Sequence, residues 1–293
     1  MERALNQGKK MTKKVLFLNP PSYEGFDGGA GSRYQAKREV LSFWYPTWLA
    51  QAAAICPGSK LLDAPVDNMT PQQTIEVAKA FDILVIYTST PGFYNDAKLA
   101  EEMKAAHPGL LIGFVGPHCT VLPEESLNAC PSLDFVARRE FDYTLFEIAS
   151  EKPLSEVGGI SYRREGQIVH NQDRDPIENM DDLPSVLDVY KRDLDIQKYY
   201  IGYLLHPYLS IYTGRGCPGH CTFCLWPQTI AGRKYRTRSP EVVVAEMERA
   251  RKMFPEVKEF FFDDDTFTAN FQRAEEIARS EERRVGKECR SRW

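Results

Sequence analysis

The sequence has no apolar run long enough to cross a membrane, because a span needs about 18 to 20 apolar residues and the longest runs, such as Ile83–Tyr87, are strand-sized. No apolar signal-peptide core stands near the start, where the first fourteen residues are polar and basic. The 37 basic and 41 acidic residues nearly cancel, so the overall charge gives no indication of nucleic-acid binding. We therefore expect no transmembrane segment and no nucleic-acid partner.

Motifs for two common nucleotide sites are also missing. No Gly-x-Gly-x-x-Gly follows the first predicted strand, which argues against a dinucleotide site. The sequence contains no Gly-x-x-x-x-Gly-Lys-Ser/Thr, which argues against a P-loop.

Cysteine is sparse outside one segment. Of the seven cysteines, three fall within eight residues, a spacing that suits metal ligation better than a disulfide framework. A chain that keeps its thiols reduced is typical of the cytoplasm, so we expect a cytoplasmic protein.

The first half of the chain alternates short apolar runs with helical patterns. Such alternation indicates a parallel sheet covered on both faces, so we predict a flavodoxin-like doubly wound α/β domain over residues 12–150, after a disordered extension at residues 1–11. Ligands in these sheets bind beyond the carboxyl ends of the strands, here the loops 19–22, 88–92 and 116–120. The alternative is that these loops are ordinary turns. The predicted strands are Val15–Leu18, Lys60–Asp63, Asp82–Tyr87, Leu110–Val115 and Leu133–Ala137.

Residues 151–207 are interpreted as a connector. The short runs Ile160–Tyr162 and Gln167–Val169 flank Arg164-Glu165-Gly166, which predicts a hairpin. The tyrosines that follow either pack against a cofactor or pack two domains together. They are Tyr190, Tyr199, Tyr200, Tyr203 and Tyr208.

A predicted strand at Leu209–Thr213 precedes the segment that contains the three closely spaced cysteines. Three thiolates on one short loop hold three corners of an iron–sulfur cubane, which leaves the fourth iron open to a substrate or cosubstrate. Glycines at 214, 216 and 219 let the loop curl so that the sulfurs point inward. The alternatives are a disulfide and a structural zinc, which needs a fourth ligand such as His206 or His220. The motif is Cys217-x3-Cys221-x2-Cys224.

The residues after this motif predict the first part of a partial (β/α) barrel over residues 208–278. A helix starts at Ser239-Pro240, a strand covers Val257–Phe262, and Thr268 is expected to cap a further helix. The strand ends in Asp263-Asp264-Asp265, where barrel enzymes place functional groups. The alternative is a solvated turn.

The cysteine motif after a strand resembles the signature of radical S-adenosylmethionine (SAM) enzymes. The resemblance implies an enzyme in which a 4Fe–4S cluster, bound by the three cysteines, cleaves SAM to a 5′-deoxyadenosyl radical. It also implies that Phe223 lies beside the adenine, and that Asp264 and Asp265 lie near the SAM amino group or ribose.

Together, the two halves resemble the cobalamin-binding subclass of that family. Two segments depart from its patterns: no Asp-x-His-x-x-Gly motif is present, and Arg139-Glu140 stands where Gly-Glu is usual. The segments that carry the resemblance are Asn19-Pro20-Pro21, Gly116-Pro117-His118 and Asp264-Asp265-x-Phe267. The cobalamin-binding residues that it implies are Asn19, Ser89, Thr90, Gly116, Pro117 and His118.

Two further segments, Cys224–Thr229 and Tyr235–Ser239, together with the tyrosine-rich connector, are similar to the hopanoid-biosynthesis-associated radical SAM family. This resemblance implies a role in hopanoid side-chain (cyclitol ether) biosynthesis. The partners would be a lipid-linked hopanoid substrate and a reductase, flavodoxin or ferredoxin as electron donor. The enzyme would be cytoplasmic or peripheral at the inner membrane.

Three alternatives stay open at this point. One is a cobalamin-dependent radical SAM methyltransferase or cyclase acting on another substrate. A second is a non-catalytic metal-binding module, and a third is a corrinoid carrier.

The final segment, residues 279–293, differs from the rest of the chain. Nine of its fifteen residues are charged and Val285 is its only aliphatic residue. We interpret it as an adapter-derived artefactual tail, with a charged solvated tail as the alternative. The gene product would then continue past Ala278, and we expect this truncated chain itself to be inactive.

Overall fold

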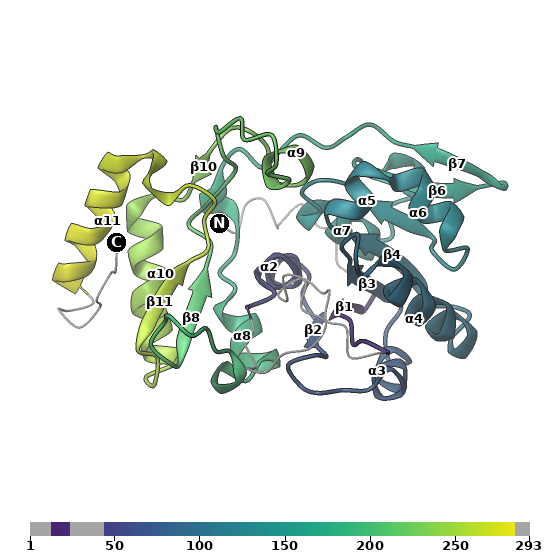
Figure 1. Ribbon diagram of the computed structural model, residues 1–293, viewed down its shortest axis with the longest axis horizontal. Coiled ribbons are helices and arrows are strands. Elements are labelled where there is room, and N and C mark those ends of the chain that lie inside the picture. The colour runs from purple at the N-terminus through teal and green to yellow at the C-terminus, as the bar shows by residue number, and fades with distance from the viewer. Residues whose placement is uncertain (1–12, 24–43, 285–293) are drawn as a thin grey trace.

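The computed structural model describes residues 13–23 and 44–284 (Figure 1). The predicted disordered extension lies outside these residues, as do residues 285–293 of the predicted tail. Within the described part, no helix is long and apolar enough to cross a bilayer.

A seven-stranded sheet organises the first part of the chain, with the strand order β2-β1-β3-β4-β5-β6-β7. The strands from β2 to β5 pair in parallel, and their 2-1-3-4-5 order is the flavodoxin-like order. The predicted doubly wound α/β fold is therefore confirmed. The strands are β1 Val15–Asn19, β2 Lys60–Asp63, β3 Ile83–Tyr87, β4 Leu111–Val115, β5 Phe135–Ala137, β6 Ile160–Arg164 and β7 Gln167–His170.

Helices cover both faces of this sheet because successive side chains of each strand point to opposite sides. On β1, Val15 and Phe17 join one core cluster, whereas Leu16 and Leu18 join the other. The helices of this part are α2 Thr47–Ile55, α3 Pro71–Ala78, α4 Phe93–Ala106, α5 Pro117–Val121, α6 Pro123–Ala129 and α7 Asp142–Ala149. We call residues 13–23 and 44–170 the sheet unit.

Helix α2 was not predicted. Eight of its nine residues are buried, so it lacks the polar face that makes an amphipathic helix recognisable in a sequence. Its burial is explained by its place between the sheet and α8, Leu187–Asp193, in the connector.

The predicted hairpin is present, and it extends the sheet. Strand β6 pairs antiparallel with β5, where Ser161 lies opposite Val136, and β7 pairs with β6. Glu165 and Gly166 both have positive φ, at 51° and 79°, as a tight two-residue hairpin turn requires. Because the hairpin pairs with β5, it is structurally part of the sheet unit rather than of the connector.

Residues 208–284, which we call the cysteine unit, contain two short sheets. Strand β8, Tyr208–Ile211, pairs in parallel with β11, Glu259–Phe262, in the way the first two strands of a (β/α) barrel do. Strand β9, Gly214–Arg215, pairs antiparallel with β10, Arg236–Thr237. The helices are α9 Trp226–Thr229, α10 Pro240–Met253 and α11 Phe271–Arg284.

The prediction that Thr268 caps the last helix is wrong. A short 3-10 turn covers Phe267–Ala269, and the backbone N–H of Arg273 donates to Asn270 Oδ1 at 3.1 Å. Asn270 is therefore the cap, because its amide oxygen reaches the third residue of the helix. Helix α11 also runs on past Ala278 to Arg284, without a break at Arg279 where the predicted tail begins.

The two units share one hydrophobic core. The cluster that contains Phe17 of β1 and Leu49 of α2 also contains Leu209 of β8 and Val243 of α10. The connector completes this core with buried tyrosines, so the sheet unit and the cysteine unit fold against each other.

Candidate active site

The cysteine loop, residues 216–235, is closed at its neck by the β9–β10 ribbon, in which Arg236 lies opposite Arg215. Gly216 has a φ of 95°, and a Cβ there would lie 2.2 Å from the carbonyl oxygen of Lys234. The backbone N–H of Cys217 donates to the carbonyl of Gly232 at 3.1 Å. The neck therefore requires glycine at position 216.

The three cysteines of the motif lie on this loop as free thiols. Cys217 and Cys224 are partly buried, whereas Cys221 is exposed. A Cβ at Gly219 would lie 3.2 Å from Cys217 Sγ and 3.9 Å from Cys221 Sγ. Glycine at position 219 therefore keeps free the space beside two of the sulfurs.

This donor set fits a cubane better than a single ion. Among the residues that the structure describes, no three His, Cys, Asp or Glu side chains converge closely enough to hold one metal ion. In a cubane each thiolate binds a different iron, so the sulfurs stand around the cluster instead of meeting at one point. Three thiols on one loop, with a glycine between two of them, match in kind and number the three protein ligands of such a cluster.

Phe223 and Asp264 have different surroundings. The Phe223 side chain is 90% exposed next to Cys224, so its ring is accessible to a ligand. Asp264 accepts hydrogen bonds from the backbone N–H and hydroxyl of Thr213, both at 2.6 Å, and from Tyr235 Oη at 2.7 Å. Burial raises the pKa of Asp264, and the hydrogen bonds from Thr213 and Tyr235 oppose that rise.

Asp264 therefore ties together the ends of β8 and β11 and the residue before β10. Asp265 beside it is exposed. The predicted contacts of both residues with SAM stay predictions.

At the carboxyl end of β1, the candidate cobalamin residue Asn19 is buried within protein. Its Nδ2 donates to Asp63 Oδ1 at 2.6 Å, and Tyr199 Oη donates to Asp63 Oδ2 at 2.8 Å. The Tyr199 ring stacks on Tyr45 with 4.1 Å between centroids. Tyr199 therefore packs the connector onto the sheet unit.

The next loops along the same edge bring three candidate residues together. His118 Nδ1 lies 3.1 Å from Thr90 Oγ1, and a Cβ at Gly116 would lie 2.4 Å from the carbonyl of Thr88. The His118 Nε2 atom is buried and has no hydrogen-bond partner in the part of the chain described. Burial lowers the pKa of His118, which favours the neutral form of the imidazole.

Ser89 and Pro117 lie in these same loops, and Ser89 is buried. Helix α5, which begins at Pro117, packs against α9, which lies within the cysteine loop just after Cys224 (Figure 1). The carboxyl edge of the sheet and the cysteine loop are therefore neighbours.

Sequence reasoning missed a buried carboxyl at this edge. Asp96 of α4 accepts a hydrogen bond from Thr88 Oγ1 at 2.6 Å and one from Asn95 Nδ2 at 3.1 Å. Burial raises the pKa of Asp96 to about 7, although the two hydrogen bonds lower it. Through its hydrogen bond from Thr88, Asp96 supports the loop after β3. In the sequence, its position does not differ from that of a surface residue on an amphipathic helix.

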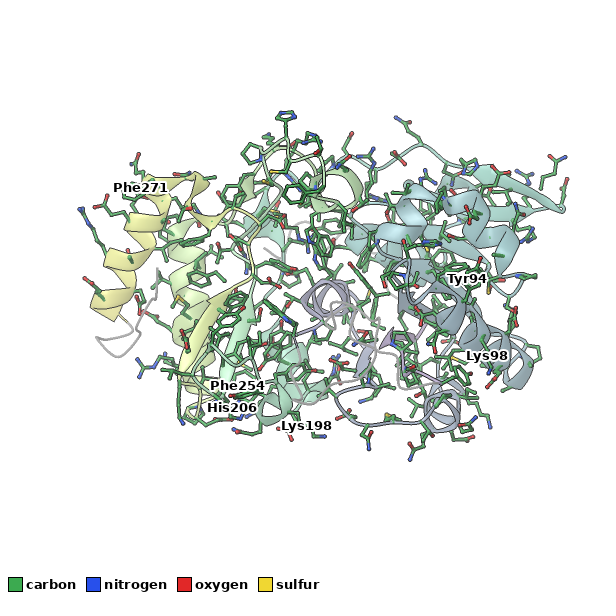
Figure 2. The ribbon with its side chains drawn as sticks, viewed as in Figure 1. Tyr94, Lys98, Lys198, His206, Phe254 and Phe271 are labelled. Carbon is green, nitrogen blue, oxygen red and sulfur yellow. The ribbon has the colours of Figure 1, made fainter. Side chains whose placement is uncertain are left out.

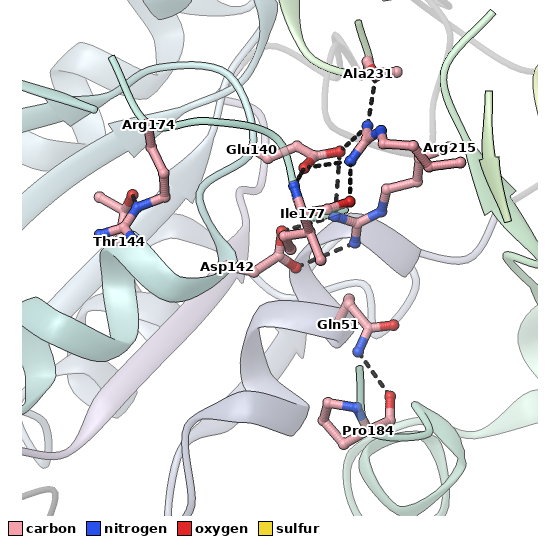
Figure 3. A network of polar contacts seen from close by, with 10 residues as sticks. Gln51, Glu140, Asp142, Thr144, Arg174, Ile177, Pro184, Arg215 and Ala231 are labelled. Carbon is pink, nitrogen blue, oxygen red and sulfur yellow. Dashed lines mark hydrogen bonds and ion pairs between the residues drawn. The ribbon is translucent and has the colours of Figure 1, made fainter. Parts of the chain in front are cut away.

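A network of buried ion pairs was also missed (Figure 3). Arg215 pairs with Asp142 through both guanidinium nitrogens, at 2.8 and 3.1 Å. Arg236 pairs with Glu140 at 2.6 and 3.0 Å. Glu140 belongs to the Arg139-Glu140 segment noted as unusual in the sequence, and here it binds an arginine of the cysteine unit.

An open pocket of about 600 Å³ lies beside the cysteine loop. Phe271, the first residue of α11 and 74% exposed, forms part of its wall. Figure 2 shows where this side chain lies. The rest of the lining is Pro218, Arg233, Lys234, Tyr235, Thr237, Ala269 and Asn270.

Comparison with known proteins identifies the cysteine unit. Residues 211–292 match the family model described as the Radical SAM superfamily. The cysteine unit is thus similar to radical SAM proteins along its length. This match agrees with the predicted enzyme class and with the predicted 4Fe–4S cluster and SAM, which radical SAM proteins use.

Two relatives that match nearly all of this chain are named as methyltransferases. One is an uncharacterized methyltransferase of Pyrococcus horikoshii, 28% identical over 275 residues, covering 90% of this chain and 56% of that protein. Another is cytidylyl-2-hydroxyethylphosphonate methyltransferase of Streptomyces wedmorensis, 27% identical over 333 residues, covering 93% of this chain and 59% of that protein.

A solved structure shares the fold. It is the radical SAM methyltransferase TsrM from Kitasatospora setae with cobalamin and a 4Fe–4S cluster bound; the TM-score is 0.66 at 15% identity, over 94% of this chain and 51% of that one. The chain thus spans between about half and three fifths of the length of these three proteins. None of the three is described as hopanoid-associated.

Proposed function

We propose that this chain is part of a cobalamin-dependent radical SAM methyltransferase. The observation that carries the proposal is the position of the Cys217–Cys224 loop, which lies next to the carboxyl edge of a 2-1-3-4-5 parallel sheet through the contact of α9 with α5. Ligands of doubly wound sheets bind at this edge, and a corrinoid there would face SAM on the cysteine loop. The methyltransferase relatives and the cobalamin bound by the solved structure support this choice.

In this proposal the three cysteine thiolates hold the cluster, which supplies the electron that splits the sulfonium carbon–sulfur bond of SAM. Phe223 packs its exposed ring against the adenine. Asp265 lies near the amino group or ribose of SAM, and Asp264 orients this region through Thr213 and Tyr235.

The corrinoid contacts are proposed for the loops after β3 and β4. Thr90 and His118 present polar atoms there, Ser89 and Pro117 line the same loops, and Gly116 lets the backbone come close. Asn19 does not face the ligand in this proposal. It supports the same edge of the sheet through its hydrogen bond to Asp63. The sequence has no Asp-x-His-x-x-Gly motif, so a bound corrinoid would find no histidine of that motif in this chain.

Anaerobic reconstitution with iron and sulfide tests the proposal. We expect about four irons per chain, a charge-transfer band, and retention of added cobalamin. With reduced flavodoxin or ferredoxin as donor, the full-length enzyme is expected to convert SAM to S-adenosylhomocysteine as well as 5′-deoxyadenosine. Formation of 5′-deoxyadenosine alone would favour a cyclase or another rearrangement, and tetrahedral zinc in anaerobically prepared protein would contradict the proposal.

Replacing one cluster ligand separates the two cofactors. The Cys221→Ala variant is expected to lose all SAM cleavage, because a cubane held at two corners is not retained, and to keep cobalamin binding. A matched Cys56→Ala variant, which changes a buried cysteine of the shared core, is expected to keep both. Loss of cobalamin binding in Cys221→Ala would contradict separate sites.

A role in hopanoid side-chain biosynthesis stays a prediction, based on the resemblance of two short segments. Offering an amino-sugar-bearing hopanoid in vesicles to the full-length enzyme would test both that role and association with the inner membrane.

A further inference from the structure

Two arginines bracket the cysteine loop. Arg215 stands two residues before Cys217, Arg236 follows the loop, and their Cα positions are paired in the β9–β10 ribbon. The ribbon has only two residues per strand, so backbone hydrogen bonds alone give it little rigidity.

Both arginines are held by carboxylates of the other unit. Asp142 opens α7 and Glu140 precedes it by two residues, and both belong to the sheet unit. Asp142 binds Arg215 through two hydrogen bonds, and Glu140 binds Arg236 through two more (Figure 3). Arg215 Nη1 also lies 3.9 Å from Glu140 Oε1. The two arginines and the two carboxylates therefore form one network.

The network is removed from solvent. None of the four residues is more than 4% exposed, and the Arg215 guanidinium lies 4.3 Å from the ring centroid of Trp48 on α2. Arg236 donates further to the carbonyls of Ala231 and Ile177, both at 2.7 Å. Two positive and two negative charges balance, and a buried charge that loses its partner is strongly unfavourable. The arginines therefore have one favourable position, which the sheet unit defines.

We propose that Glu140 and Asp142 are positioning residues for the cysteine loop: by holding Arg215 and Arg236 they fix the neck of the loop, and so the placement of Cys217 relative to the sheet. The proposal rests on the proposed function in so far as the loop holds the cluster. Neither carboxylate touches the reacting atoms, and both act through the arginines.

The test uses Asp142→Asn and Glu140→Gln in the 293-residue chain. A matched control is Glu246→Gln, which breaks the similarly buried pair between Glu246 of α10 and Arg238, the residue after β10, and leaves Arg215 and Arg236 paired with their carboxylates. Thermal unfolding of all variants measures the general cost of losing a buried ion pair. Asp142→Glu, which keeps the charge, is the conservative variant and is expected to restore wild-type behaviour in part.

The first readout needs no cluster: the rate at which iodoacetamide alkylates each loop cysteine in the metal-free protein, followed by peptide mass mapping. We expect Asp142→Asn to raise the rate at Cys217 at least about tenfold, because local opening of the neck exposes the thiol. The control is expected to match the wild type. If Asp142→Asn is insoluble, Glu140→Gln, which leaves the Arg215–Asp142 pair intact, is measured in the same way.

The second readout is the electron paramagnetic resonance spectrum of the reduced, reconstituted protein with and without SAM. We expect the SAM-induced change to be lost or altered in Asp142→Asn while iron content is kept. Unchanged alkylation in both variants, or an equal increase in Glu246→Gln, would overturn the inference. A wild-type chain that takes up no cluster would instead count against the proposed function, and the alkylation rates would still decide the inference.

Discussion

Strand β1 of the sheet unit is buried along all five residues, whereas all four residues of β11 in the cysteine unit are only partly buried. The difference follows from their neighbours: β1 lies between β2 and β3 with helices on both faces, and β11 pairs with β8 in a sheet of two strands. Two strands are too few to form a stable sheet alone, so the cysteine unit depends on the core that it shares with the sheet unit. The sheet unit thus supports itself and, through Glu140 and Asp142, the loop of its neighbour.

The largest effect is expected from a change at the neck of the cysteine loop. Such a change tests whether the cysteine unit is the part of the protein that depends on support from its neighbour. We expect Gly216→Ala to cost about 4 kcal/mol of stability and to prevent cluster retention, because the new Cβ would meet the carbonyl of Lys234 at positive φ. Gly202→Ala, where a Cβ meets nothing within 4 Å, is the matched control and is expected to be neutral. Urea unfolding and iron content measure both; full iron content in Gly216→Ala would contradict the tight neck.

A second test concerns the sheet unit alone. The pKa of Asp96 is raised from its ordinary value of 3.8 to about 7, so the folded state holds a proton that the unfolded state releases. Stability is therefore expected to fall as pH rises between these values, by about 2 to 3 kcal/mol from pH 5 to pH 8. Asp96→Asn should remove this part of the pH dependence.

Urea unfolding of wild type and Asp96→Asn at several pH values isolates the effect of this one group. Parallel stability curves for the two proteins would show that Asp96 ionises normally. Cluster content is expected to be the same in both, because Asp96 lies under the loop after β3 and not at the loop neck.

A third test concerns the connector. Tyr199→Phe removes a hydrogen bond to the buried carboxylate of Asp63 and is expected to cost about 1.5 to 3 kcal/mol. The stacking on Tyr45 is retained in this variant, so the measured loss of stability is that of the hydroxyl group alone. Tyr94→Phe, at a side chain that is 75% exposed, serves as the neutral control in thermal unfolding.

The smallest expected effect is at the hairpin turn. Glu165 has a φ of 51°, which asparagine tolerates better, so Glu165→Asn is expected to stabilise the protein by less than about 1 kcal/mol. A rise in melting temperature without any change in cluster properties would agree with the turn's distance from the site. A loss of stability would mean that Glu165 makes a contact that the turn geometry does not reveal.

Much of the fold was predictable because it follows from local patterns. The apolar runs of β1 and β3 are where the sequence places them, and α10 begins at the predicted Ser239-Pro240. Helix α2 was not predicted because it is buried on nearly every side and so has no alternation of polar and apolar faces in its sequence. Thr268 and Asn270 are both capping residues by type, and only the 3-10 turn before α11 decides between them.

The candidate site likewise has one part that local sequence predicts and another that depends on how the chain folds. The spacing of Cys217, Cys221 and Cys224 alone predicts the cluster loop, because ligand spacing on one short segment is a local property. The contact of Thr90 with His118 joins loops 28 residues apart, and the sequence suggested it only through the carboxyl-end rule for parallel sheets. The roles of Phe223 and Asp265 toward SAM stay predictions.

By itself, the sequence determined the alternation of strands and helices, the hairpin and the trio of cysteines, since each depends on residues close together in the chain. Only the tertiary structure decided that the hairpin joins β5 and that Asp142 and Glu140 pair with arginines 73 and 96 positions further on. An arginine or a carboxylate has many possible partners in a sequence. Burial in a shared core selects one of them, because a charge removed from water needs an opposite charge at hydrogen-bond distance.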